Sequence, residues 1–121
     1  MPPVDPTDYC AAARRFASVD LAASREPGQL RLAFAELRAV LPVMASAAPT
    51  ELRDDLGIVV TGYGKLGAAT EQGGWQWGTL AGAVLAIGED RTFTAAGERV
   101  DAYNQRACGV VPIGSPATTA R

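Results

Sequence analysis

A glycine pattern in the middle of the chain has the spacing that nucleotide-binding turns use. The segment LGIVVTGYGKLG, residues 56–67, contains Gly62, Gly64 and Gly67. In a dinucleotide-binding domain such a turn joins a strand to a helix, and its backbone N–H groups hold the pyrophosphate. An acidic residue about 20 positions later binds the ribose, and Glu89 stands near that distance. One interpretation is therefore a nucleotide-binding α/β domain that uses this turn and Glu89.

The apolar positions around the same glycines favour a helix instead. From a helix start at Pro49 they step by four and three straight through the glycine pattern, at Leu52, Leu56, Val59, Tyr63 and Leu66. The segment that should form the helix after a Rossmann turn, up to residue 78, is too rich in glycine for one. We therefore expect a continuous helix in which Gly57, Gly64 and Gly67 let neighbouring helices approach closely. The α/β domain is kept as the alternative.

Three aromatic residues form a second candidate site. Trp75 and Trp77 flank Gln76 in a glycine-rich segment, and Tyr63 is expected nearby. Tryptophans on a loop can stack on an apolar ligand or a sugar ring, or they can anchor a partner protein. The alternative is that they close the open end of a helical domain as part of its core. The sequence thus makes Tyr63, Trp75 and Trp77 a candidate ligand or partner patch.

Catalytic and metal-binding chemistry has little support in the sequence. The chain contains no His, which removes the commonest general base and the commonest metal ligand. Glu51 and Asp55 share one face of an expected helix, but they have no partner base and no metal-ligand set, so we interpret them as solvated acids beside Arg53. We predict no catalytic, cofactor-binding or metal-binding residue, which favours a protein that is not an enzyme.

Length and charge limit the class of protein further. The 121 residues suffice for one domain with a core. The formal net charge is −2 and no segment is strongly basic, which argues against nucleic-acid binding. The longest apolar run, residues 79–88, is shorter than the roughly 20 residues that a membrane-spanning helix needs. The first residues lack the charged and apolar regions of a signal peptide, so we expect either a cytosolic protein or a mature exported one.

The cysteines help to choose between these compartments. Cys10 and Cys108 are the only two in the chain, and such a pair can be bridged or can be two ordinary buried thiols. The residues before Cys10 do not form a lipoprotein cleavage site, so we do not interpret it as lipidated. A bridge would close a loop of about 100 residues, for which chain entropy predicts a stabilisation of roughly 4–5 kcal/mol. We favour the bridge, and a bridge favours export.

The rest of the sequence is typical of amphipathic helices. We expect them over residues 5–24, 29–48, 49–72 and 92–108. Pro42 interrupts the second helix, which we interpret as a kink, with a break at Leu41 as the alternative. Thr92 or Thr94 is expected to cap the last helix. Residues 75–88 are too irregular to decide between a helix and a strand.

These helices predict an all-α fold, an up-down four-helix bundle. The bundle would comprise residues 5–109, and residues 110–121 would form a flexible C-terminal tail. In this topology the first and last helices are antiparallel neighbours, which brings Cys10 near Cys108. The bundle and the disulfide therefore support each other.

Three features carry a resemblance to known proteins: a cysteine early in the first helix, the segment APTELRDDL at 48–56, and the segment RVDAYNQRACGV at 99–110. In these features the chain resembles small exported helical proteins of actinobacteria, many of which are described as hypothetical secreted proteins or lipoproteins. The similarity covers roughly residues 8–110, and the glycine- and tryptophan-rich residues 57–88 depart from it. The resemblance implies an exported helical bundle with Cys10 and Cys108 paired, and it implies no reaction.

Together, these observations predict a non-enzymatic binding or accessory module in the extracellular space or the cell envelope. We expect its partner to be an envelope protein or a small apolar ligand, and we expect no cofactor, no nucleic acid and no membrane span. One alternative is a helical carrier of a small apolar ligand with Tyr63, Trp75 and Trp77 at its mouth. The other is the nucleotide-binding α/β domain.

Overall fold

The computed structural model describes residues 6–21 and 23–110, and within them the chain is all-α. The elements are α1 (Pro6–Ala17), α2 (Pro27–Ala47), the 3₁₀ turn η1 (Thr50–Leu52), α3 (Arg53–Gln72), α4 (Trp77–Gly88) and α5 (Arg91–Cys108). The all-α prediction is confirmed. The predicted number of helices is wrong, because the described residues form five α-helices rather than four. The additional helix is α4, from the segment that periodicity left open between helix and strand.

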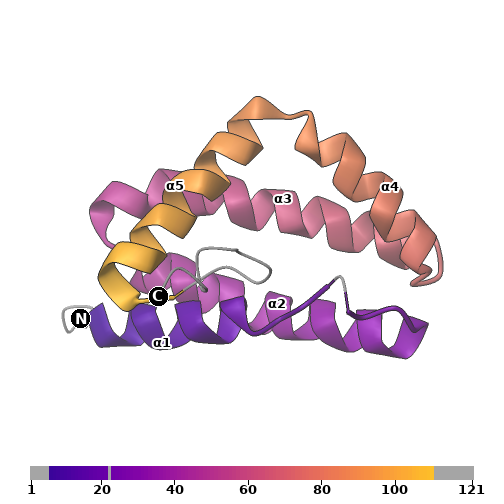
Figure 1. Cartoon of the computed structure of the whole chain (residues 1–121), viewed down its shortest axis with the longest axis horizontal. Helices are drawn as coiled ribbons and strands as arrows, with labels where there is room; N and C mark the ends of the chain where they lie inside the picture. Colours follow the sequence, from indigo (N-terminus) through magenta and orange to yellow (C-terminus); the bar gives the residue numbers. More distant parts are fainter. Residues whose placement is uncertain (1–5, 22, 111–121) are drawn as a thin grey trace, which may run out of the picture.

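The helices are arranged around α3 (Figure 1). α1 and α2 lie side by side in opposite directions, and α3 returns over α2. α4 folds back along α3, and α5 then descends across α3 to the N-terminal end of α1. The bent pair of α4 and α5 therefore takes the place of the single fourth helix of an up-down bundle.

Two residues with left-handed backbone make the reversal between α3 and α4. Gly74 has φ 75° and Trp75 has φ 61°, a conformation that glycine adopts freely and that strains a bulky residue. The backbone N–H of Trp75 donates to the carbonyl of Thr70 over 2.8 Å, which closes the end of α3. A Cβ at Gly73 would overlap Thr79 of α4. The turn is therefore tight enough to lay α4 along α3.

A second sharp junction separates α4 from α5. The Asp90 carboxylate accepts hydrogen bonds from the backbone N–H groups of Thr92 at 3.0 Å and Phe93 at 3.2 Å. The prediction that Thr92 or Thr94 caps this helix is therefore wrong, because Asp90 precedes them in extended backbone from which its side chain reaches two unpaired donors. At the other end of α5, Gly109 with φ 68° closes the helix.

α1 is shorter than the sequence predicts, and its early end leaves space in the domain. The helix ends at Ala17 instead of continuing to Ser24. The Ser18 hydroxyl donates to the Arg15 carbonyl over 2.7 Å, a local bond that competes with helix continuation. With 12 residues α1 is roughly 18 Å long, whereas α2 with 21 residues is roughly 31 Å long. An irregular link, not a helix, follows α1 beside the first half of α2 (Figure 1).

α2 continues through Pro42, so the alternative of a break at Leu41 is wrong. A proline leaves the carbonyl four residues earlier, that of Arg38, without its helical partner. Both Pro42 and Arg38 are exposed, so water can satisfy that carbonyl. The predicted start of the third helix at Pro49 is also shifted, because η1 comes first and α3 begins at Arg53.

The apolar seam predicted through the glycine pattern contributes to the core, where Leu56, Val59 and Leu66 are buried. α2 faces it with the buried residues Leu30, Phe34, Leu37, Leu41 and Met44. Val110, which the sequence analysis assigned to the tail, is also buried and packs against this core. Asp5 and residues 111–121 lie outside the described residues.

The predicted Cys10–Cys108 disulfide is present. It joins the start of α1 to the last turn of α5, with the two Cα atoms 5.3 Å apart. Beside it the Arg14 side chain donates to the Cys108 carbonyl over 3.2 Å. The bridge spans 98 positions of sequence, and the chain entropy of such a loop corresponds to roughly 4–5 kcal/mol. The first and last described helices are therefore fixed to each other.

Candidate functional site

The glycine pattern lies inside α3 and forms no nucleotide-binding turn. Arg53–Gln72 is one helix, which confirms the helical interpretation of this segment. The strand and turn on which the α/β alternative depends are absent from this position. Glu89, the residue expected at the ribose, is exposed just after α4.

Two glycines of α3 allow neighbouring side chains to approach closely. A Cβ at Gly62 would overlap the Phe93 ring of α5, and a Cβ at Gly67 would lie 3.2 Å from a core ring. Gly57 and Gly64 face open space. The prediction of close approach is therefore right for Gly67 and wrong for Gly57 and Gly64, because the faces of α3 that become covered depend on where α4 and α5 pack.

Asp55 of α3 forms an ion pair with Arg99 of α5, so the prediction of a solvated acid beside Arg53 is wrong for Asp55. The Asp55 carboxylate accepts from the Arg99 guanidinium of α5 at 2.8 and 3.0 Å, and this hydrogen bonding lowers the pKa of Asp55. Glu51 and Asp54 are exposed. Within residues 6–21 and 23–110, no group of three or more Cys, Asp or Glu side chains is placed to hold a metal ion.

The two tryptophans close the turn between α3 and α4. Trp75 packs against Phe34, with 6.0 Å between the ring centroids, and the Arg38 guanidinium lies 6.0 Å from its ring. Trp77 lies beneath the Arg25 guanidinium at 4.3 Å. The Trp77 indole nitrogen is buried and has no hydrogen-bond partner in the described part of the chain. Both rings pack against the core, as the alternative interpretation of these residues expects.

Tyr63 has different neighbours. Its ring packs edge-on against Phe16 of α1 and Phe93 of α5, with centroid distances of 5.6 and 6.1 Å. Among the rings that the structure describes, none of its contacts is with Trp75 or Trp77. The candidate patch of Tyr63, Trp75 and Trp77 thus divides into two separate aromatic regions.

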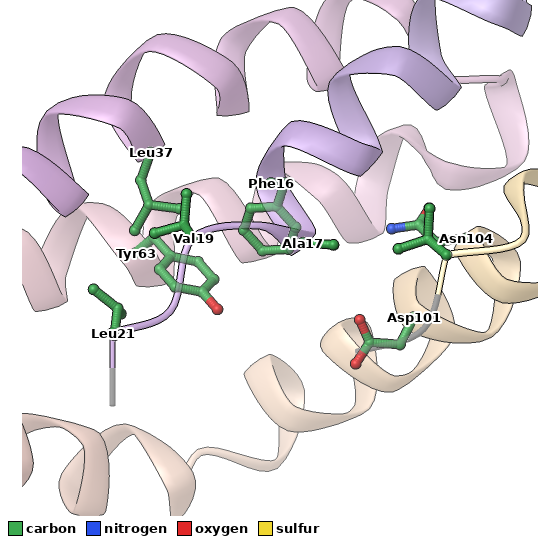
Figure 2. A pocket seen from close by; sticks show the side chains of 9 residues that line it. Phe16, Ala17, Val19, Leu21, Leu37, Tyr63, Asp101 and Asn104 are labelled. Atoms are coloured by element: carbon green, nitrogen blue, oxygen red, sulfur yellow. The ribbon is translucent and has the colours of Figure 1, made fainter. Parts of the chain in front are cut away.

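A cavity of about 220 Å³ opens beside Tyr63, where α1 ends (Figure 2). We call it the α1 cavity. It is lined by Phe16, Ala17, Val19, Leu21, Leu37, Tyr63, Asp101, Asn104 and Val110. Its walls come from α1, the link after α1, α2, α3 and α5, so it exists because α1 stops before filling this space. Apolar side chains and polar groups line it together, a combination that small-molecule sites use.

Three polar side chains line the α1 cavity. Figure 2 shows the Tyr63 hydroxyl and the Asp101 carboxylate turned toward one another from α3 and α5. Asn104 follows one turn after Asp101, and its Oδ1 accepts from the Tyr9 hydroxyl over 2.6 Å. This bond holds the amide in place and leaves its nitrogen without a described partner. A phenol, a carboxylate and an amide can thus orient a ligand that the apolar walls enclose.

Burial controls the ionisation of the two acids in this cavity. It raises the pKa of the Asp101 carboxyl, because the charged form is desolvated. It also raises the pKa of the Tyr63 hydroxyl, and the nearby Asp101 charge adds to that effect. No hydrogen bond or ion pair from a described residue reaches the Asp101 carboxylate. Arg99, the basic residue closest to it in sequence, is bound to Asp55.

A second cavity continues the same aromatic region between α3 and α5. Its volume is about 330 Å³, and it shares Phe16, Tyr63 and Asp101 with the α1 cavity. Phe93 and Glu98 line its far side. Asp101 therefore stands at the junction of two adjoining hollows.

The residues that surround Tyr63 were not predicted from the sequence as site residues. They are Phe16, Phe93, Asp101 and Asn104. A signal was present in α5, where a second stripe runs beside the apolar seam at Phe93, Gly97, Asp101 and Asn104. Two polar residues on a stripe that begins with a core aromatic residue indicate a helix face that is only partly packed.

Comparison with protein-family models, with curated protein sequences and with solved structures finds no match to this chain. The resemblance to exported actinobacterial proteins therefore stays a prediction.

None of the helices in the described residues has both the length and the apolar character needed to cross a membrane.

Proposed function

We propose that this protein is a non-enzymatic binding module that works outside the cytoplasm and holds a small ligand with an apolar body in the α1 cavity. One observation carries the proposal. An aromatic and aliphatic cavity opens where α1 ends, and polar side chains from α3 and α5 line it. Such a combination binds an apolar body and orients it by a few polar contacts.

The volume of the α1 cavity indicates the size of the ligand. Its 220 Å³ exceeds the roughly 150 Å³ of an engineered cavity that accepts benzene. It is smaller than the about 300–1,000 Å³ of sites for drug-sized molecules. A single ring with a short substituent fits this range. Phe16, Val19 and Leu37 would supply its apolar contacts.

The disulfide supports the proposed location. Cys10 and Cys108 are bridged, and the described residues contain no free cysteine. Disulfides persist mainly in secreted and envelope proteins, because thiol-reducing systems remove them in most cytosols. The proposed function combines the predicted binding module with the alternative of a carrier for a small apolar ligand. The proposed site is at Phe16, Tyr63 and Asp101 instead of at the tryptophans. An envelope-protein partner stays a prediction.

Titration with toluene tests the proposed cavity directly. Toluene is a single apolar ring, and two-dimensional NMR of the oxidised full chain would report which amides respond. We expect saturable shifts at Phe16, Tyr63 and Asp101. Ala17→Phe places a ring in the cavity and should abolish these shifts. Ala39→Phe, at an exposed position of α2, is the matched control and should bind toluene like the unmodified protein.

Two outcomes would overturn the proposed function. One is the absence of saturable shifts around the α1 cavity at toluene concentrations near its solubility limit. The other is equal toluene binding by the Ala17→Phe and Ala39→Phe variants when both unfold cooperatively. Either result would mean that the cavity is not a ligand site.

A further inference from the structure

We propose that the ligand of the α1 cavity carries a protonated amine, recognised by the Asp101 carboxylate within the aromatic frame of Phe16, Tyr63 and Phe93. This inference rests on the proposed function and names the chemical class of the ligand. The ligand would be a small aromatic or aliphatic ammonium compound.

The position of Asp101 is the first reason. It is half-buried on α5 and lines both adjoining cavities. Its carboxylate receives no hydrogen bond and no ion pair from a described residue, as shown above. A carboxylate withdrawn from water loses hydration energy unless a charged or hydrogen-bonding partner replaces the water. An ammonium group in the cavity would be such a partner, because N⁺–H···O⁻ hydrogen bonds are among the stronger ones in proteins.

The surrounding rings are the second reason. Phe16, Tyr63 and Phe93 follow one another in edge-to-face contacts of 5.6 and 6.1 Å. Aromatic faces attract cations through the ring quadrupole. Within the described chain, no arginine or lysine lies over any of these three rings. A cation supplied by a ligand would find both an aromatic surface and a carboxylate here.

The rest of the protein shows that its own cations are placed elsewhere. Arg25 lies over Trp77, Arg38 over Trp75 and Arg106 over Tyr103. The pairing of arginine with an aromatic ring therefore recurs outside the cavity. Around the α1 cavity the aromatic rings are accompanied by an acid instead. This charge favours cationic ligands and disfavours anionic ones by like-charge repulsion.

Three probes that share a phenylethyl group test the inference on the oxidised full chain. They are 2-phenylethylamine, 2-phenylethanol and 3-phenylpropionate, which differ in the charge of the polar end. We expect the amine to bind at least about tenfold more tightly than the alcohol, the usual scale of a hydrogen bond to a charged group. The carboxylate should bind most weakly. NMR titration at pH 7 measures all three.

Two matched variants locate the charge that is responsible. Asp101→Asn keeps the shape of the side chain and should lower the affinity for 2-phenylethylamine about tenfold or more, while changing that for 2-phenylethanol less than threefold. Asp54→Asn removes an exposed carboxylate of α3 outside the α1 cavity and should leave both affinities unchanged. Thermal unfolding of each variant confirms that it folds.

The outcomes separate this inference from the proposed function. Equal binding of the amine and the alcohol to the unmodified protein would overturn the amine inference and leave the apolar site standing. An amine preference that survives Asp101→Asn would also overturn it. Failure of all three probes and of toluene would overturn both.

Discussion

The turn that carries Trp75 and Trp77 and the α1 cavity are both built from aromatic rings, but only the turn has cations on those rings. Arg25 lies 4.3 Å from the Trp77 ring, and Arg38 lies 6.0 Å from the Trp75 ring. At the α1 cavity the charged side chain is Asp101, and no cation from the described residues accompanies it. The rings of the turn thus have cations supplied by the chain itself, whereas the cavity has room and charge for a further group.

The contrast between the two regions shows that aromatic residues alone do not identify a binding site. In sequence, the paired tryptophans were the more conspicuous feature, yet their rings pack against the core. The less conspicuous Tyr63 lies where three helices meet imperfectly, beside an acid without a described partner. The groups around a ring, more than the ring itself, decide whether it can receive a ligand.

The largest loss of stability should follow removal of the disulfide. The disulfide supports the α1 cavity more than it supports the tryptophan turn. Replacing Cys10 and Cys108 by Ser removes the covalent link between α1 and α5, which form two walls of the cavity. We expect the free energy of unfolding to fall by roughly 4 kcal/mol, measured by urea denaturation. Hydrogen exchange should accelerate most in α1 and least around Trp75. A loss under about 1 kcal/mol, or uniform acceleration, would contradict this prediction.

A smaller loss should follow from crowding the aromatic frame of the cavity. Gly62→Ala puts a methyl group into the space of the Phe93 ring, and overpacking of this kind costs about 1–3 kcal/mol. Gly57→Ala is the matched control on the same helix, in open space, and should stabilise the protein by about 0.5–1 kcal/mol. Thermal unfolding of both variants measures the contrast. Equal effects at the two positions would refute the described packing of α5 on α3.

Removing the charge of the cavity should stabilise the protein slightly. Burial raises the pKa of Asp101 in the folded state, so between the unfolded and folded pKa values the folded protein binds more protons and stability falls as pH rises. Asp101→Asn should remove this cost and raise the unfolding free energy by about 0.5–1 kcal/mol at pH 7.

The pH dependence provides the internal control for that prediction. The advantage of Asp101→Asn should vanish below about pH 4, the usual pKa of an aspartate, because the carboxyl is then neutral in both states. The full advantage of the variant should appear only above the raised pKa that Asp101 has in the folded protein. Thermal unfolding of the variant and of the unmodified chain across this range measures the difference. A destabilised variant at pH 7 would show that Asp101 has a favourable partner.

The smallest loss of stability should follow removal of the cation at the tryptophan turn. Arg25→Ala removes the guanidinium from the Trp77 ring, and such contacts contribute about 0.5–1 kcal/mol. The tryptophan fluorescence should change as well, while toluene binding at the α1 cavity stays the same. Arg31→Ala, at an exposed position of α2, is the control. If both variants behave alike, the Arg25–Trp77 contact has no energetic role.

Local patterns in the sequence were sufficient for four of the five described helices and for much of the core. The four-and-three spacing of Leu56, Val59 and Leu66 predicted buried positions that are buried, because a helix repeats every 3.6 residues whatever its neighbours are. The same reasoning placed the glycine pattern within a helix. The two cysteines at the ends of the helical region were predicted to pair, and they do.

Features that depend on competing short-range bonds could not be predicted in this way. The C-terminal end of α1 and the cap of α5 were misplaced because the Ser18 and Asp90 side chains form hydrogen bonds with nearby backbone groups. α4 was undecided because ten apolar residues fit a buried helix or a strand equally well. In the structure this segment is a helix, which follows the turn at Trp75 and lies back along α3.

The residue pattern alone predicts a helical domain with an apolar core, because helix periodicity is a property of short segments. Which aromatic residues surround a cavity depends on how the helices pack. Phe16, Tyr63 and Asp101 come from three different helices and line one cavity at the end of α1. The space they share arises where helices of different length pack together. No single segment of the sequence encodes that packing.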